Sequence, residues 1–398
     1  MILCAVTAAA DTVLVADFRA EGRENNGAAI SLGLPYMIAR SLNGTPGIQA
    51  ILPDPPAGRP IARLYNTDGM PDFEAAGRLL SGTGAQRCLL GRAARPPRAG
   101  GASTVVFYLL DSGGGRPEAF SAEISGDACL PALATWAAAR IAPRGARVPA
   151  PAIPHGLLPS FSRGLGLLRA GDADGAELAL LGAAREYPAS ADLRFLLGSA
   201  AARRGKPYDA LRLFNEASNL DPSFSLPPYR EGMAWLSLGR NTLAEKAFDR
   251  AVGAQPSFFE ALLESGAIKT ASGSFQAAET ALRRAIAMRP GHFEARYRLA
   301  KCLALEGKAG RAMGILRALA AEHAGHGPSR LLLGKLLFQA SEYGAAEAEA
   351  RVAVRLMPDD PEAHALLADA LSRQGGLNRS MEAESELRKA IRLQDAGR

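Results

Sequence analysis

The sequence is poor in the features that mark membrane proteins and nucleic-acid binders. No stretch of the 398 residues reaches the roughly 18 uninterrupted apolar residues that a membrane-spanning helix requires. No run of five or more basic residues occurs, and acidic residues are interspersed among the basic ones although the formal net charge is +6. We therefore predict no transmembrane segment and no nucleic-acid partner.

Cysteine is scarce as well. Only 4 cysteines occur, and the simplest interpretation is that they are buried thiols that act as small hydrophobic residues. Cys88 and Cys129 lie in the same predicted domain, so a disulfide between them is the alternative. Cysteine usage therefore does not decide the redox compartment.

Motifs that carry catalysis are missing. The Gly-Lys pairs that begin at residues 205, 307 and 334 are not followed by serine or threonine as in a phosphate-binding loop, and no G-x-S-x-G motif occurs. His323 and His326 beside Glu322 have a spacing that suits a metal, but a solvated turn explains them better. We predict that the chain is not an enzyme and that it holds no cofactor and no metal.

Hydrophobic residues make up 48% of the chain, enough to bury more than one core, and three segments follow one another. Residues 11–142 mix short strands and helices, and residues 143–156 are a proline-rich extended linker. Residues 157–398 are helical. The sequence thus predicts an α+β protein, with an N-terminal α/β domain built on a mixed sheet and then an all-α solenoid.

Apolar and β-branched runs place the elements of the first domain. They predict strands at residues 12–18, 48–52, 87–92, 104–110 and 118–125, the last two joined as a hairpin by the glycine-rich residues 111–115. Periodic apolar residues predict helices at 28–42, 72–80 and 129–141.

Residues 1–10 have the character of a truncated signal peptide. An apolar run from Ile2 ends in Ala8-Ala9-Ala10 before Asp11, which fits an A-x-A cleavage site. No lysine or arginine precedes the run, so the alternative is a lead-in to the first strand. We expect export, with the periplasm as the location; the alternative is the cytoplasm.

Several short strings occur in a fixed order in the first domain: Val13–Phe18, Thr45–Ile48, Ala76–Leu80, Leu89–Gly91 and Leu109–Gly113. Their order and spacing resemble the amino-terminal domain of TolB-type bacterial proteins over residues 11–142. The sequence departs from that family at Ala16, where proline is usual, and at Leu90, where an acidic residue is common. The resemblance implies a non-catalytic domain with a role in recognition or assembly.

From Leu157 onward the sequence repeats with one period. Four glycines lie 34 residues apart: Gly164, Gly198, Gly232 and Gly266. Prolines follow the same period, with Ala324 in one of the places: Pro188, Pro222, Pro256, Pro290 and Pro358. Within each unit a glycine such as Gly205 ends a first helix, and the proline ends a second. Because stacked units bury their faces on one another, such a repeat predicts a binding scaffold.

The strings Gly205–Ala210 and Asp221–Pro222 are close to the usual pattern of tetratricopeptide repeats. The resemblance implies about seven helix pairs over residues 157–398 that form a right-handed superhelix. Core positions are expected at one phase of the second helices: Phe214, Phe248, Leu282 and Leu316. In the last unit the alanines are displaced by three residues, so its final helix, with a polar string from Glu382 to Arg392, is expected to cap the stack.

The resemblance places partner-binding residues on the first helices, which would line the concave face. We predict these residues by their phase in the repeat: Phe195, Ser199, Tyr229, Arg230, Met233, Leu263, Ala267, Tyr297, Arg298, Lys301, Leu331, Lys335, Phe338 and Asp369. Aromatic and cationic side chains together suit an acidic peptide with apolar anchors. The first helices lack the asparagines with which some such domains grip a carboxy-terminal carboxylate, so we expect no chaperone-tail clamp.

The sequence as a whole therefore predicts a non-enzymatic scaffold that binds a protein or peptide, in the assembly of cell-envelope complexes. The alternative is a cytoplasmic regulatory module whose N-terminal domain senses a small ligand.

Overall fold

The computed structural model describes residues 11–20, 29–45, 48–51, 64, 70–83, 85–94, 103–113, 116–124, 130–149 and 153–396. The chain divides into two compact units. Unit 1 comprises Met1–Leu262 with Ala287–Arg289, and unit 2 comprises Leu263–Ile286 with Pro290–Arg398.

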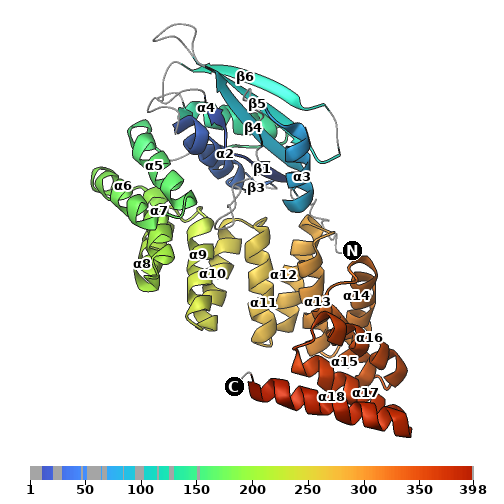
Figure 1. Cartoon of the computed structure of the whole chain (residues 1–398). Coiled ribbons are helices and arrows are strands. Elements are labelled where there is room, and N and C mark those ends of the chain that lie inside the picture. The colour runs from blue at the N-terminus through green and yellow to red at the C-terminus, as the bar shows by residue number, and fades with distance from the viewer. Residues whose placement is uncertain are drawn as a thin grey trace, which may run out of the picture. The chain divides into compact units, whose positions relative to one another are not determined.

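Unit 1 begins with a mixed sheet, as predicted (Figure 1). Its strands lie in the order β3-β1-β4-β5-β6, and β2 pairs with the far end of β4. The pairs β1–β3 and β1–β4 are parallel, whereas β4–β5 and β5–β6 are antiparallel. The bounds are β1 Asp11–Val15, β2 Arg19–Ala20, β3 Ile48–Ile51, β4 Arg87–Ala94, β5 Ser103–Asp111 and β6 Glu118–Ile124.

Three helices cover the two faces of this sheet because its strands alternate apolar side chains between the faces. Val13 and Val15 of β1 belong to the core that contains α2 (Leu34–Asn43) and α4 (Leu130–Ile141). Leu14 belongs to the opposite core, which contains α3 (Phe73–Thr83). A turn of π-helix, η1 (Ala29–Gly33), precedes α2. The predicted helices and the hairpin are confirmed, although residues 114–115 of its loop lie outside the described residues.

Cys88 is the buried thiol that the sequence suggested. It lies in the core beside α3 with no exposed surface, and it is a free cysteine, as is the buried Cys302. Burial raises the pKa of the Cys88 thiol to about 12, so this group is an unreactive hydrophobic residue. The proposed partner Cys129 lies outside the described residues.

Seven helix pairs follow, as predicted. Their bounds are α5 Leu158–Arg169, α6 Ala173–Glu186, α7 Ala191–Arg203, α8 Pro207–Leu220, α9 Leu226–Ser237, α10 Asn241–Ala254, α11 Phe259–Ala271, α12 Phe275–Met288, α13 Phe293–Leu305, α14 Ala309–Glu322, α15 Gly327–Gln339, α16 Tyr343–Leu356, α17 Pro361–Gln374 and α18 Leu377–Ala396. The predicted breaks are confirmed, since Gly205 adopts φ +71° between α7 and α8 and Ser341 adopts φ 64° at the equivalent place between α15 and α16.

Within a pair, the first helix approaches the second closely at the predicted glycine. A Cβ atom on Gly232 would lie 2.6 Å from the ring of Phe248, and one on Gly198 would lie 2.7 Å from the ring of Phe214. The predicted core positions are confirmed because Phe214, Phe248, Leu282 and Leu316 are all fully buried.

The sheet domain and the first repeats share one core, a point that the sequence left open. A single apolar cluster extends from Val13 of β1 to Phe224, which follows α8. Helix α5 packs against η1 and α2, and the rings of Tyr36 and Phe161 lie 4.8 Å apart in an edge-to-face arrangement. Residues 143–149 form no helix, as predicted, but Val148 and Ile153 pack into this cluster. The predicted linker therefore does not separate two cores.

In the last pair, α18 packs on α17 through Ala383 and Ala390, which are buried at the predicted positions. The expectation that Glu386 belongs to a polar surface is wrong. Its carboxylate is buried and hydrogen-bonds Nδ1 of His364, whose Nε2 donates to the carbonyl of Pro358 at 2.9 Å. The exposed part of α18 is mixed, since Leu377 and Met381 are exposed together with charged residues.

Candidate functional site

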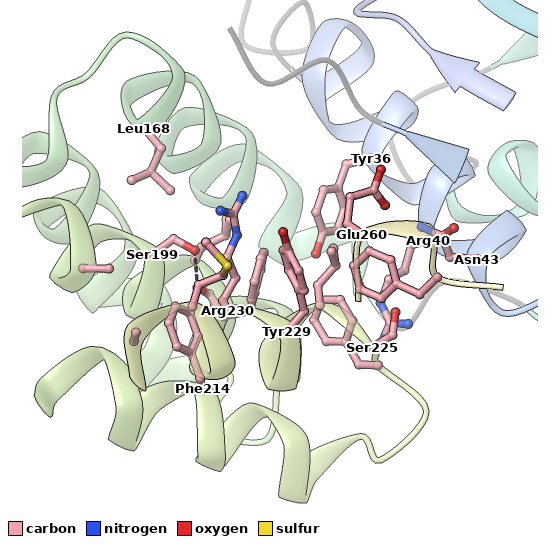
Figure 2. Close-up of a pocket in the computed structure, with 18 of the residues that line it drawn as sticks. Tyr36, Arg40, Asn43, Leu168, Ser199, Phe214, Ser225, Tyr229, Arg230 and Glu260 are labelled. Atoms are coloured by element: carbon pink, nitrogen blue, oxygen red, sulfur yellow. Dashed lines mark hydrogen bonds between the residues drawn. The ribbon is translucent and has the colours of Figure 1, made fainter. Parts of the chain in front are cut away.

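A pocket of about 850 Å³ lies in unit 1, between the sheet domain and the first helices of the repeats (Figure 2). Helix α2 and strand β3 supply one wall, and α5, α7 and α9 supply the others. The turns before α9 and α11 close one end with Phe224 and Phe258. The volume falls in the range of small-molecule sites.

Five of the predicted partner-binding residues line this pocket: Phe195, Ser199, Tyr229, Arg230 and Met233. Arg230 and Met233 are exposed, whereas Phe195 is only 7% exposed and packs on Phe224 with the ring centroids 5.2 Å apart. Phe195 therefore supports the wall of the pocket, whereas Arg230 and Met233 are exposed residues of its lining.

Helix α2 contributes residues that the sequence did not indicate. The Arg40 guanidinium lies 3.7 Å from the centroid of the Phe224 ring and forms ion pairs with Asp192 and Asp221. The Tyr36 hydroxyl donates to Asp192 Oδ1 at 2.8 Å. These interactions fasten the sheet domain to the start of α7 and the turn after α8.

Burial and charge set the protonation of this group. Burial raises the pKa of Tyr36 well above its ordinary value, and the carboxylate of Asp192 raises it further, so Tyr36 remains a donor. Burial alone would raise the pKa of Asp221 too. Hydrogen bonds from Ser223 and Arg40 outweigh that effect and hold the pKa of Asp221 below its ordinary value.

A second polar group fastens β3 to the start of α11. Gln49 Nε2 donates to Glu260 Oε2 at 2.6 Å, and the Arg289 guanidinium donates to Glu260 Oε1 at 3.2 Å. Arg289 also lies 4.0 Å from the centroid of the Phe259 ring. Nearby, Gln255 Nε2 donates to Asn43 Oδ1 at 3.0 Å. The wall that α2 and β3 form is thus held along its length.

The other predicted residues lie in unit 2, and two of them have structural roles. Arg298 donates to Glu264 at 3.0 Å and to Glu294 at 2.6 Å, which joins α11 to α13. Phe338 is half-buried and packs edge-on against Tyr343 of the same pair, with the ring centroids 5.3 Å apart. Both side chains hold helices together.

Three other predicted residues of unit 2 are accessible to solvent: Lys301, Lys335 and Asp369. Lys335 of α15 forms an ion pair with Glu362 of α17 at 2.5 Å. The hydrogen bond from Lys335 lowers the pKa of Glu362, and the charge of Lys301 on α13 lowers it as well, so the three groups are neighbours. Lys301 and Asp369 are exposed.

Tyr297 belongs to a cluster of rings with Phe293 and His326, whose rings lie 6.4 Å and 5.1 Å from that of Tyr297. His326 caps α15, because its Nδ1 accepts from the backbone N–H of Ser329 at 3.1 Å. Burial lowers the pKa of His326, which suits this accepting role. Within the described part of the chain, no group of three histidine, cysteine, aspartate or glutamate side chains is placed to bind a metal.

None of the described helices combines the length and the apolar character that crossing a membrane requires.

Comparisons with known proteins identify the repeats. Models of the tetratricopeptide repeat match residues 161–223, 269–316 and 303–370. The matched segments are accordingly tetratricopeptide repeats within the helical solenoid, a fold that typically serves as a non-enzymatic protein-interaction scaffold. No curated protein matches the chain. The resemblance of residues 11–142 to the TolB-type domain remains a prediction.

Solved structures similar to the chain are tetratricopeptide-repeat proteins of low identity. YrrB, described as a protein with an unusual peptide-binding site, is 21% identical, with a TM-score of 0.44 over 46% of this chain and 95% of YrrB. A tetratricopeptide repeat protein from Parabacteroides merdae is 18% identical, with a TM-score of 0.45 over 59% of this chain and 91% of that one. MamA from Desulfovibrio magneticus is 21% identical, with a TM-score of 0.40 over 42% of this chain and 95% of MamA.

Proposed function

We propose that this scaffold binds an acidic segment of a protein partner, with apolar anchors, along the first helices of its pairs. The observation that carries the proposal is the surface of unit 2 where Lys301, Lys335 and Glu362 come together from α13, α15 and α17. Consecutive first helices present cations there at the same phase of the repeat. A partner carboxylate would replace Glu362 at Lys335, and the partner's apolar side chains would pack on neighbouring rings such as Tyr297.

The proposal is tested by selecting peptides from a random phage-displayed library on the full-length protein. We expect the enriched peptides to share acidic and apolar residues. A synthetic peptide of that sequence should bind the double variant Lys301→Gln/Lys335→Gln about fivefold to tenfold more weakly, with a shallower salt dependence. The melting temperature should change little because both lysines lie at the surface.

The matched control is Lys206→Gln/Lys246→Gln, which removes two exposed charges at the start of α8 and on α10, both second helices. We expect this variant to bind as the unaltered protein does. The proposal fails if no peptide is enriched, or if the two double variants bind the peptide equally well.

The setting that we propose is the cell envelope, as a component of complex assembly. The apolar residues 2–10 and the Ala8-Ala9-Ala10 string support export. Mass spectrometry of the chain recovered from an exporting bacterial host tests this: a first residue at Asp11 agrees with export, and retention of Met1 places the chain in the cytoplasm.

A second candidate function is ligand sensing by the N-terminal domain. One observation favours it, namely that α2 and β3 of that domain form a wall of the pocket together with the repeats. A ligand there would contact both parts of unit 1. Thermal-shift screening of the full-length chain with metabolites tests this candidate, since a ligand well above its dissociation constant stabilises the protein by a few kcal/mol.

A further inference from the structure

Helix α18, the long red helix of Figure 1, has two faces of different character. Ala383, Glu386 and Ala390 are buried on the face that packs against α17. The opposite face carries large apolar side chains that are 47% to 80% exposed: Leu377, Met381, Leu387 and Ile391. A helix that only closed the stack of repeats would present a polar face there. The outer face of α18 therefore has the composition of an interface.

The outermost residues of α18 are spaced as in the seam of a coiled coil. Each of the six preceding second helices has 14 residues, whereas α18 has 20. Its outer row, which we call the seam, alternates steps of four and three residues, the period by which two helices pair along their length. The seam consists of six exposed residues: Leu377, Met381, Glu384, Arg388, Ile391 and Asp395.

The seam is complementary to itself in one arrangement. When two copies of α18 run antiparallel, with a twofold axis at the level of residue 386, Met381 of each copy faces Ile391 of the other. In the same register Glu384 of each copy faces Arg388 of the other. A slide by one layer in either direction places an apolar residue opposite a charged one. A parallel pair places Glu384 opposite Glu384, which like charges disfavour.

The other end of the stack of repeats is closed to a second copy. Leu158 and Phe161 of α5 have no exposed surface, because η1 and α2 pack on this first repeat helix. Contact between α18 of one copy and α5 of the next, which would extend the stack head to tail, is therefore blocked. Pairing of α18 with α18 has no such obstacle and closes after two copies.

From these observations we propose that two copies of this chain form a twofold-symmetric dimer through antiparallel pairing of their α18 helices. Leu387 lies beside the axis and adds apolar contact at the centre of the seam. One helix from each copy makes a small interface, so we expect a dissociation constant on the order of 10 µM. The inference concerns self-association, and it does not depend on the binding of a protein partner.

The test is sedimentation velocity of the 398-residue chain at concentrations from about 1 to 100 µM, a range that spans the expected dissociation constant. We expect the unaltered chain to change from monomer to dimer over this range. Glu384→Arg places an arginine opposite Arg388 of the second copy, and Arg388→Glu places two glutamates opposite each other. Each variant alone should associate at least tenfold more weakly, because like charges then face each other across the seam.

An equal mixture of Glu384→Arg and Arg388→Glu should dimerise about as well as the unaltered chain. In a mixed pair each introduced charge faces its opposite, a rescue that loss of helix stability would not produce. Met381→Glu removes an apolar contact of the seam and should weaken association at least tenfold. Its matched control is Leu178→Glu, which changes a 76% exposed leucine of α6 and should leave association unchanged.

Several results would overturn the inference: a monomer at every concentration, single charge variants that dimerise as the unaltered chain does, or equal effects of Met381→Glu and Leu178→Glu. A mixture that stays monomeric would overturn the antiparallel pairing. A monomer that binds vesicles of phosphatidylglycerol, and loses that binding in Met381→Glu, would assign the face to a membrane surface instead. None of these results bears on the peptide selection at Lys301 and Lys335, so the two proposals fail separately.

Discussion

At the scale of single residues, Arg40 connects the sheet domain to two places in the repeats of unit 1. Its guanidinium is 11% exposed and lies between the ring of Phe224 and two carboxylates, one of which, Asp192, is 1% exposed. A buried carboxylate that loses its cation costs more than an exposed pair contributes, because water cannot replace the lost partner. Arg40 therefore helps to hold the sheet domain on the repeats.

We predict that Arg40→Met lowers the free energy of unfolding of unit 1 by about 3 to 5 kcal/mol, since it leaves Asp192 with only the hydroxyl of Tyr36. The two tryptophans of the chain, Trp136 and Trp235, both lie in unit 1, so their fluorescence during denaturation reports this loss. The control is Arg78→Met, whose pair with Glu74 is 65% and 85% exposed and should contribute less than about 1 kcal/mol. Equal, small losses in both variants would show that Arg40 is dispensable.

Glu279 makes the stability of unit 2 depend on pH. Burial opposes its ionisation, but hydrogen bonds from Arg283, Arg311 and Lys308 lower the pKa of Glu279 to about 2, from 4.5. A carboxyl group with a lowered pKa in the folded state stabilises the protein above its unfolded pKa, and that contribution is lost as the pH falls toward the folded pKa.

We expect Glu279→Gln to melt at a lower temperature than the unaltered protein at pH 6, by an amount that shrinks between pH 4.5 and pH 2. Helical circular dichroism during heating measures both proteins. The matched control is Glu384→Gln, which removes an exposed pair with Arg388. A difference for Glu279→Gln that stays constant down to pH 2 would contradict the assigned cause.

At the scale of elements, the distance between the helices of a pair depends on glycine at one position. Gly232 of α9 faces the ring of Phe248 on α10, and a methyl group there would overlap the ring. Gly182 of α6 meets nothing within 4 Å, so a methyl group would enter open space. These two glycines separate the packing effect of an added methyl group from its effect on helix propensity.

We predict that Gly232→Ala destabilises unit 1 by about 1 to 3 kcal/mol through overpacking. Gly182→Ala should stabilise it by about 0.5 to 1 kcal/mol, because alanine is the better helix former and nothing obstructs it. Denaturant unfolding followed by tryptophan fluorescence measures both. Two changes of the same sign would show that propensity or packing alone governs these helices.

The sequence predicted the positions of individual helices and strands better than it predicted the contacts between them. Apolar periodicity located the strands from β1 to β6, apart from the two-residue β2, and the helices α2 to α4, and the period of glycines and prolines located the helix pairs from α5 to α18. Glu386 marks where this reasoning fails. A glutamate in a charged string of α18 looked exposed, but α17 brings His364 against it, and no local pattern encodes that pairing.

At the scale of unit 1 as a whole, the sheet domain completes the first repeat. Leu158 and Phe161 of α5 have no exposed surface, since η1 and α2 cover them in place of a preceding repeat. The end of a stack of repeats otherwise needs a polar face. The sheet and the first helix pairs should therefore open as one cooperative body.

Hydrogen exchange of the full-length chain tests this. We expect the slowest amides of β1, β4, α5 and α7 to exchange with similar opening free energies, because one apolar cluster connects them. Tyr36→Ala should lower the protection of all four elements together. Early exchange of α5 and α7 beside a protected sheet would show two separate cooperative units.

The sequence by itself determined the mixed sheet and the repeats, each with two helices. It also determined which side chains recur at equivalent positions of the first helices. Hydrogen bonding and burial within each unit of 34 residues set the helix pairs, and the same residue pattern recurs from unit to unit. Only the tertiary structure decided that α2 closes a pocket over Tyr229 and Arg230. Tyr36 and Arg40 are 152 to 181 residues from the carboxylates that they bind, and what joins them is burial in a shared core, which leaves no spacing for a sequence pattern to reveal.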